Sequence, residues 1–235
     1  MKKVLLKWGL IGTVLLFSFA SLAQALTLSG VDGTWSNNVG GSNVNFPIGV
    51  AIGYGNGLED QVRWGIGSPT PSLQSGLGFT GISPPASTFN IGDDFEIGQL
   101  RHFNNPIQSG SQASAVDLGI LLTFTDPLGL NGTFAFTFAI NETPNPAPDI
   151  ITFPLAYPPQ TFDIGGIDYT LHLLGFGNSP STLVSQFISP EESTNSTRLW
   201  GEITTPAAVP EPATMLLLGS GLIGLAGFAR RRFKK

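Results

Sequence analysis

The sequence contains no cysteine. Disulfide bonds, thiolate metal ligands and a cysteine nucleophile are therefore excluded, and the folded part must be held together by its own core. Histidine is nearly as scarce, with only His102 and His172 in 235 residues. A G-x-S-x-G motif is also missing, so the sequence gives little support to an enzymatic function.

Basic residues are almost missing from the central part of the chain. Between residues 26 and 209, the only ones are Arg63, Arg101 and Arg198, against 15 acidic residues, so the net charge there is −12 with histidine neutral. Every lysine lies in a terminal segment. Because binding to nucleic acid requires clustered lysine and arginine, we expect an acidic domain with no nucleic-acid partner.

The first 25 residues have the pattern of a secretory signal peptide. Three lysines within the first seven residues precede an apolar stretch at 8–20, and Ala23 and Ala25 form a small-residue cleavage site. The sequence therefore predicts a signal peptide at 1–25 and a mature chain that starts at Leu26. The alternative is an uncleaved N-terminal anchor.

The last 27 residues have three parts. The quartet Val209, Pro210, Glu211 and Pro212 comes first, an uncharged run at 213–229 follows, and a basic cluster ends the chain. A helix over this run would be about 26 Å long, which is near the lower limit for a transmembrane helix. The cluster, which includes Arg230, Arg231 and Arg232, would stay in the cytoplasm. We therefore predict one transmembrane helix at 213–229.

These three parts resemble the PEP-CTERM sorting signal of Gram-negative bacteria. The resemblance covers residues 209–235 and implies processing near the Pro-Glu-Pro triplet by an exosortase, a membrane-embedded cysteine transpeptidase. A plain C-terminal membrane anchor is the alternative, but an anchor has no need of two prolines that block a helix.

Residues 26–204 are predicted to form a domain of β-strands. Apolar side chains alternate at 114–125, with Leu121 as the exception, and four large apolar residues share one face at 133–140. Residues 126–132 between these stretches are rich in turn formers, so the two are predicted to form a central hairpin. Further strands are predicted at 61–65, 76–82, 94–103, 149–153, 169–176 and 197–204.

Short two-faced strands without a convincing amphipathic helix favour an all-β fold. We predict an antiparallel β-sandwich, jelly-roll-like, over residues 26–204, followed by a linker at 205–208. Enough residues are present for a single core.

The most distinctive internal stretch is 93–107. Its alternation predicts a strand that ends at Asn104, Asn105 and Pro106. In one interpretation, His102 and Asn104 bond to loop backbone groups at a structural corner. In the other, His102 binds a ligand or a metal.

This stretch also resembles a family of exported β domains called choice-of-anchor K, and the related THxN proteins with a PEP-CTERM signal. The resemblance covers most of residues 34–204. Within the stretch, the resemblance is carried by Phe95, Gly98, His102, Asn104, Pro106 and Ile107. Downstream pieces at 141–145, 149–153, 169–176 and 192–203 also contribute to it. Arg101 stands where the THxN motif has threonine. The resemblance implies an exported domain and no catalytic activity.

One loop is rich in oxygen ligands. Asn141, Glu142 and Asp149 are a candidate Ca²⁺ site, because carboxylate and amide oxygens are the ligands that this ion prefers. The sequence predicts no other cofactor. Residues 191–195 are a second such stretch, and a solvated loop with local turns is the alternative in both places.

We therefore expect an exported, non-enzymatic protein of the cell surface or extracellular matrix, associated with exopolysaccharide. Its partners would be the secretion machinery and an exosortase. A Ca²⁺-dependent carbohydrate-binding module is one alternative, in which Trp35 is exposed and able to stack on sugar. A polysaccharide hydrolase that uses two carboxylates is the other.

Overall fold

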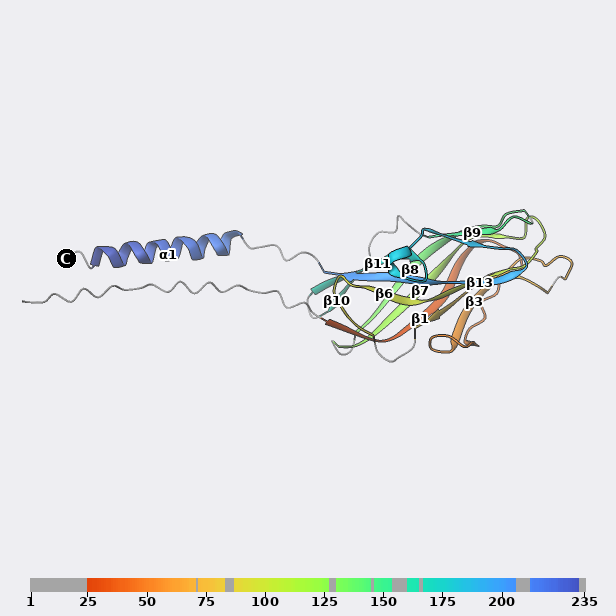
Figure 1. The fold of residues 1–235 in the computed structure, drawn as a ribbon, viewed down its shortest axis with the longest axis horizontal. Helices are drawn as coiled ribbons and strands as arrows, with labels where there is room; N and C mark the ends of the chain where they lie inside the picture. Colours follow the sequence, from red (N-terminus) through yellow and green to blue (C-terminus); the bar gives the residue numbers. More distant parts are fainter. Residues whose placement is uncertain are drawn as a thin grey trace, which may run out of the picture.

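The computed structural model describes residues 25–70, 72–82, 87–126, 130–144, 146–153, 160–164, 167–205 and 212–232 of the chain. Within these residues, the chain forms two antiparallel β-sheets and, after them, one α-helix (Figure 1). The predicted all-β fold with antiparallel strands is confirmed. The finer jelly-roll designation stays a prediction.

The two sheets draw their strands from all parts of the domain. In spatial order, the first sheet contains β12 (Gln186–Ser189), β9 (Asp149–Thr152), β8 (Leu130–Asn141), β7 (Ala113–Asp126), β1 (Ala25–Gly40) and β5 (Ser87–Asn90). The second sheet contains β10 (Gln160–Ile164), β11 (Ile167–Phe176), β13 (Ser193–Thr204), β6 (Asp94–Asn104), β4 (Ser75–Gly81), β3 (Leu58–Trp64) and β2 (Val50–Ala51). A 3₁₀ turn, η1 (Pro180–Thr182), precedes β12.

The β7–β8 hairpin is the pair that alternation predicts. Val116 faces Phe138, Leu118 faces Phe136 and Ile120 faces Phe134. All six of these side chains are buried, whereas Leu121 is 36% exposed. The alternation of apolar residues therefore predicted correctly both that these segments are strands and which face of each is buried.

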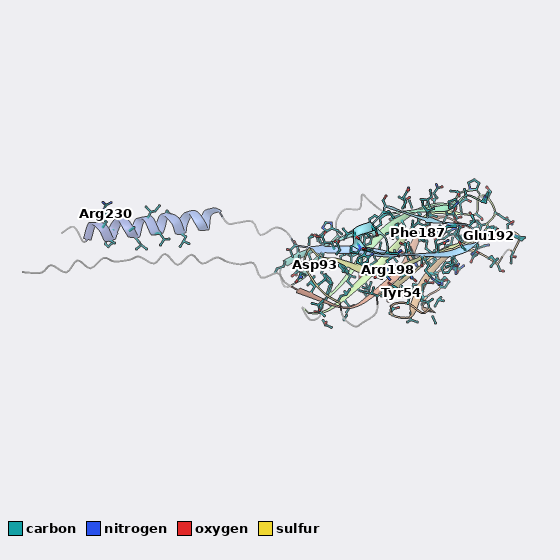
Figure 2. All side chains as sticks on the ribbon, in the orientation of Figure 1. Tyr54, Asp93, Phe187, Glu192, Arg198 and Arg230 are labelled. Atoms are coloured by element: carbon teal, nitrogen blue, oxygen red, sulfur yellow. The ribbon has the colours of Figure 1, made fainter. Side chains whose placement is uncertain are left out.

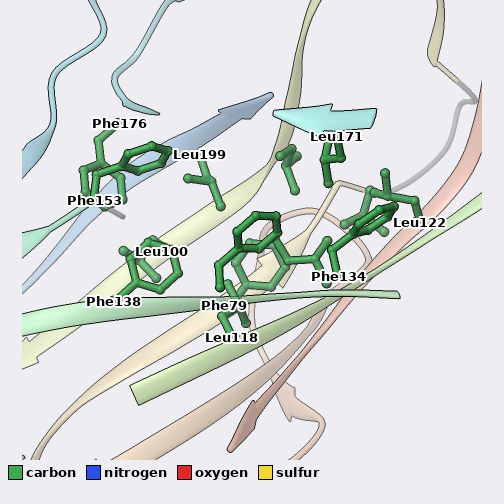
Figure 3. Packing of buried hydrophobic residues seen from close by; sticks show 14 of the residues in the cluster. Phe79, Leu100, Leu118, Leu122, Phe134, Phe138, Phe153, Leu171, Phe176 and Leu199 are labelled. Atoms are coloured by element: carbon green, nitrogen blue, oxygen red, sulfur yellow. The ribbon is translucent and has the colours of Figure 1, made fainter. Parts of the chain in front are cut away.

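The buried apolar side chains of both sheets form one continuous cluster between the layers (Figure 3). Phenylalanine dominates it, and Phe138 contacts Trp35 edge-on at a centroid distance of 6.2 Å. Such ring pairs add to the free energy of burial and fix orientations in the core. A shared core of this kind explains how a chain without disulfides holds two sheets together.

Strand β1 was missed by the sequence prediction. It is 16 residues long and pairs with β7 along most of its length, with several register shifts. Glycine and asparagine interrupt its alternation, so its pattern does not look like a strand. Gly33 is required by packing, because a Cβ atom there would lie 2.1 Å from the ring of Phe79 on the opposite sheet. The short strands β2, β5, β10 and β12 were missed as well.

A bulge in β6 changes which side chains face the core. Leu199 of β13 pairs with Gly98, and the next residue, Trp200, pairs with Glu96, so Ile97 is the extra residue. Phe95 and Ile97 point inward before the bulge, and Leu100 and His102 point inward after it. Bulges commonly re-aim side chains in this way. The bulge is what turns His102 to the interior.

Helix α1 (Pro212–Arg232) confirms the helix predicted at 213–229. Within the described residues, no helix has both the length and the apolar character of a membrane span. The transmembrane helix at 213–229 stays a prediction. The predicted signal peptide lies outside the described residues, apart from Ala25, which opens β1.

Candidate functional site

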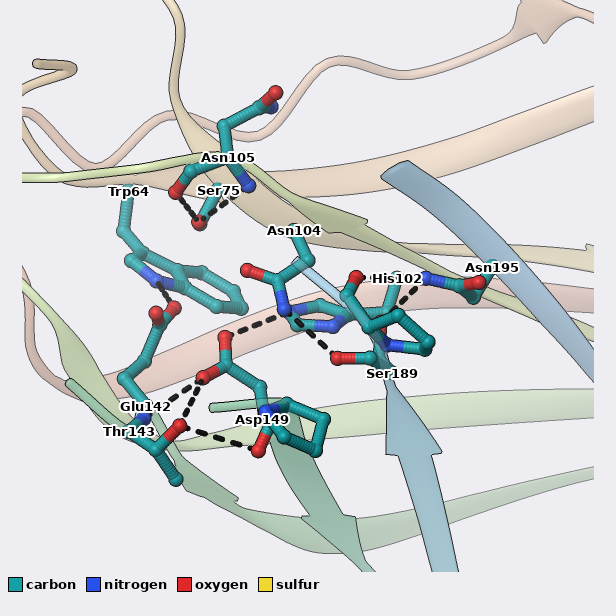
Figure 4. A network of polar contacts seen from close by, with 12 residues as sticks. Trp64, Ser75, His102, Asn104, Asn105, Glu142, Thr143, Asp149, Ser189 and Asn195 are labelled. Carbon is teal, nitrogen blue, oxygen red and sulfur yellow. Dashed lines mark hydrogen bonds and ion pairs between the residues drawn. The ribbon is translucent and has the colours of Figure 1, made fainter. Parts of the chain in front are cut away.

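Polar side chains from both sheets meet inside one end of the domain (Figure 4). The central group consists of His102 from β6, Glu142 directly after β8 and Asp149 at the start of β9. One ligand atom from each of the three lies within 4.8 Å of the others. Because β6 belongs to one sheet and β8 and β9 to the other, the cluster joins the two layers.

The strand pattern of β8 decides which acidic loop residues reach this cluster. Phe138 and Ile140 face the core, so Glu142 follows on the same side and Asn141 lies on the opposite side, where it is exposed. Of the predicted ligand set, Asn141 thus lies on the exposed face, away from the side that carries Glu142. The structure brings Glu142 and Asp149 together with His102 instead.

Each carboxylate is held by one of its two oxygens. The indole Nε1–H of Trp64 donates to Glu142 Oε1 at 2.5 Å. The backbone N–H of Thr143 donates to Asp149 Oδ1 at 2.7 Å. These bonds fix the two groups, which also share a side-chain hydrogen bond with each other. Asp149 Oδ2 is buried without a hydrogen-bond partner.

His102 is fully buried and neither of its ring nitrogens has a hydrogen-bond partner. Its Nε2 lies 4.0 Å from Asp149 Oδ2, which is beyond hydrogen-bond distance. The ring of Trp64 stacks against it at a centroid distance of 6.4 Å. The predicted bond from His102 to a loop backbone group is therefore not formed.

Asn104 behaves as the structural interpretation predicts. Its amide donates to the backbone oxygen of Ser189 at 2.8 Å and so links the end of β6 to β12. Its own Oδ1 is buried without a hydrogen-bond partner, on the same face of β6 as His102. Pro106, the third motif residue, follows in the loop, and its backbone oxygen accepts a bond from the N–H of Ser68 at 2.9 Å.

Burial controls the charge states in the cluster. It lowers the pKa of His102 to about 3, and the positive charge of Arg63 adds to this effect, so the imidazole is neutral. Burial, together with the negative charge of Asp149, raises the pKa of Glu142 to about 8. Burial also raises the pKa of Asp149. A buried neutral imidazole thus lies beside two carboxyl groups, and ionising both of these at once is unfavourable.

A cavity of the described region borders the cluster at Glu142. A cavity of about 290 Å³ is lined by Glu142, Thr143 and Pro144 together with residues of the 105–112 loop. Glu142 is half-buried at its wall, whereas the side chains of His102 and Asp149 are 0% exposed behind it. Small solutes can approach Glu142, but the two inner groups are closed to anything large.

The other predicted candidates lie apart from this cluster. His172 of β11 has its Nε2 3.0 Å from the hydroxyl of Thr204, and it is half-buried on the outward face, as alternation predicts. In the 191–195 stretch, Asn195 donates to Ser189 Oγ at 2.9 Å and to the backbone oxygen of Pro190 at 3.1 Å. These bonds are those of a structural turn.

Among the residues that the structure describes, the tryptophans do not form an exposed platform for sugar. Trp35, predicted to be exposed, is 4% exposed, and its indole N–H donates to the backbone oxygen of Asp60 at 2.9 Å. Its place in a strand turns it to the core, so that prediction is wrong. Trp64 is buried as predicted, and Trp200 is half-buried with its indole N–H bonded to Gly177.

The C-terminal segment decides the relationship to known proteins. Residues 208–232 match the family model of the PEP-CTERM protein-sorting motif. This sorting motif implies an exported protein that an exosortase processes, with a membrane-anchored intermediate before it reaches the surface. Pro212 opens α1 and Arg230 to Arg232 end it, whereas Val209, Pro210 and Glu211 lie outside the described residues. A search of curated proteins finds no match to the chain.

Proposed function

We propose that this protein is an exported, non-enzymatic domain of the cell surface or extracellular matrix, which an exosortase releases or transfers at the Pro-Glu-Pro triplet. The observation that carries the proposal is the sorting motif at 208–232, which directly follows a domain with its own core. In this account the β domain is the cargo, and the motif determines its destination.

The surfaces of the two parts fit this division. The β domain is strongly acidic, which keeps an exported protein soluble and favours a polysaccharide matrix over nucleic acid as its setting. Helix α1 in contrast exposes large apolar side chains, among them Leu222, Ile223 and Phe228. Exposed groups of this kind suit the apolar surroundings of an intermediate that awaits processing.

The geometry of the polar cluster supports a non-enzymatic role. A retaining glycosidase needs two carboxyl groups about 5–5.5 Å apart, both within reach of the sugar. Glu142 borders a cavity, but Asp149 is closed off behind it with 0% of its side chain exposed. A sugar ring therefore has no path to the second carboxylate, which disfavours the hydrolase.

The contacts of the motif residues support the resemblance to choice-of-anchor K domains. His102 and Asn195 are directly paired on β6 and β13, so two stretches that carry the resemblance lie side by side. Asn104 ties the same corner to β12. We propose that residues 26–204 are such a domain, with Arg101 in place of the threonine.

Substitution of the triplet tests the proposed sorting. We expect Glu211→Ala, produced in cells that contain an exosortase, to accumulate as an unprocessed membrane-held form instead of reaching the surface. Glu202→Gln on β13 is the control, because it alters one acidic residue of the β domain and leaves the motif intact. Equal processing and release of both variants would refute the sorting proposal.

A further inference from the structure

We propose that His102, Glu142 and Asp149 form a binding site for a divalent transition-metal ion, of which Zn²⁺ is the representative, and that this ion links the two sheets. The proposal goes beyond sorting and export. It rests on buried donor atoms that the protein itself leaves without partners.

Hydrogen bonds from neighbouring groups hold the two carboxylates of the cluster in position. Trp64 holds Glu142 Oε1, and Thr143 holds Asp149 Oδ1, so both carboxylates are fixed in position and Asp149 keeps its Oδ2 atom without a hydrogen-bond partner. Metal-binding carboxylates and histidines are usually oriented by such outer hydrogen bonds. Trp64 serves this purpose twice, because its ring also stacks against His102.

Buried polar groups in proteins rarely stay without a hydrogen-bond partner. Both ring nitrogens of His102 and the Oδ2 atom of Asp149 are buried without a hydrogen-bond partner. Leaving such a group unpaired costs about 1–3 kcal/mol. A cation bound between His102 Nε2 and Asp149 Oδ2 would satisfy both atoms at once, and it would offset two carboxylate charges that lie close together.

The three donor atoms, which lie within 4.8 Å of one another, must move closer together to share one ion. Ligand atoms on a tetrahedral Zn²⁺ ion with bonds of about 2.1 Å lie roughly 3.4 Å apart. The 4.0 Å between His102 Nε2 and Asp149 Oδ2 must therefore shrink by about 0.6 Å. The cavity that Glu142 borders gives an entry path and room for a water ligand.

The donor types favour a transition metal over Ca²⁺. Imidazole nitrogen suits Zn²⁺ and its neighbours, whereas Ca²⁺ takes six to eight oxygen ligands. Asn141, which would add an oxygen, lies on the other face of its strand. The site is thus too poor in oxygen for Ca²⁺ and has the one nitrogen that a transition metal prefers.

Zinc titration of the purified full chain, first stripped with EDTA, tests the proposal. We expect one Zn²⁺ to bind per cluster, the thermal midpoint to rise, and the imidazole nitrogen resonances of His102 to shift while those of His172 stay unchanged. Ca²⁺ at the same concentration should leave the midpoint unchanged. The assignment would be overturned if the His102 resonances did not shift on addition of Zn²⁺. It would also be overturned if Ca²⁺ raised the thermal midpoint as much as Zn²⁺.

Two variants make the test specific. Glu142→Gln should lower Zn²⁺ affinity at least about 10-fold, the range seen when ligand sets of metal sites are disturbed. Glu142 is the accessible member, so this variant should fold even where Asp149→Asn does not. His172→Asn removes the other histidine and should leave affinity unchanged. Equal Zn²⁺ affinity in Glu142→Gln and the unaltered chain would show binding elsewhere and refute the site.

Discussion

The Arg101 guanidinium donates two hydrogen bonds to the Glu59 carboxylate, from Nε to Oε2 at 2.6 Å and from Nη2 to Oε1 at 2.7 Å. Glu59 is fully buried, and Gln61 donates a further bond to its Oε1 at 2.6 Å. In the proposed resemblance to the THxN proteins, Arg101 stands in the place of the threonine, and β3 supplies it with an acidic partner.

Replacing Arg101 with threonine should be strongly destabilising in this chain. Arg101→Thr leaves the buried Glu59 carboxylate without its cation, and removal of one partner of a buried pair costs about 3 kcal/mol or more. Urea unfolding measures the loss. Arg198→Gln, at a residue labelled in Figure 2, is the control. Its pair with Glu96 is partly exposed and should contribute less than about 1 kcal/mol. If both variants unfold at the same urea concentration, the buried pair is not the source of stability.

The same ion pair depends on a glycine. Gly78 lies between β3 and β6, and a Cβ atom there would lie 2.4 Å from the carboxyl carbon of Glu59. We expect Gly78→Ala to destabilise the domain by about 1–3 kcal/mol through overpacking. Gly30→Ala, whose Cβ atom would meet nothing within 4 Å, is the matched control and should change stability little. Equal effects would show that the close approach is tolerated.

Neighbouring leucines on β7 test the assignment of its faces. Leu122 is fully buried and Leu121 is 36% exposed. Leu122→Ala should cost about 2–5 kcal/mol, because it leaves a cavity in the core, and Leu121→Ala should cost well under half as much. Chemical denaturation of both variants gives the comparison. A larger loss for Leu121→Ala would mean that the register of the hairpin is wrong.

The pH dependence of stability should carry the signature of Glu142. Its pKa rises from an ordinary 4.5 in the unfolded chain to about 8 in the folded one. The folded state thus binds the proton more tightly, so this contribution to stability is complete below pH 4.5 and is lost as pH rises toward 8. Glu142→Gln, measured in EDTA, should remove this decline, at most about 1.4 kcal/mol per pH unit. An identical decline in both proteins would contradict the shift.

His102 acts in the opposite direction on the acid side. Its pKa falls from 6.5 to about 3, so the unfolded chain takes up a proton that the folded one refuses. Stability should therefore fall as pH drops from 6.5 toward 3. The Glu142→Gln variant should keep this acid limb, which separates the two groups in one experiment.

Alternation in the sequence predicted the strands whose one face is wholly apolar, and β7 and β8 are the clearest cases. It failed for β1, where Gly33, which admits the ring of Phe79 from the opposite sheet, helps to break the pattern. Strands held mainly by their neighbours give a weak local signal, so β1 and the short edge strands could not be found from their own residues.

The candidate site was predictable only in part. Glu142 and Asp149 stand near each other in sequence, so their proximity was accessible, and the parity of β8 could have excluded Asn141 at that stage. The approach of His102 was not accessible, because it depends on the extra residue at Ile97 and on the packing of two sheets. Trp64 gave no signal beyond that of a core residue.

The mass of the mature protein from cells that contain an exosortase tests the central claim most directly. The account predicts a new C-terminus at or near Pro210-Glu211-Pro212, loss of the segment that ends in Arg230, Arg231 and Arg232, and an N-terminus at Leu26. A chain that reaches the surface with its arginine cluster intact would contradict the account.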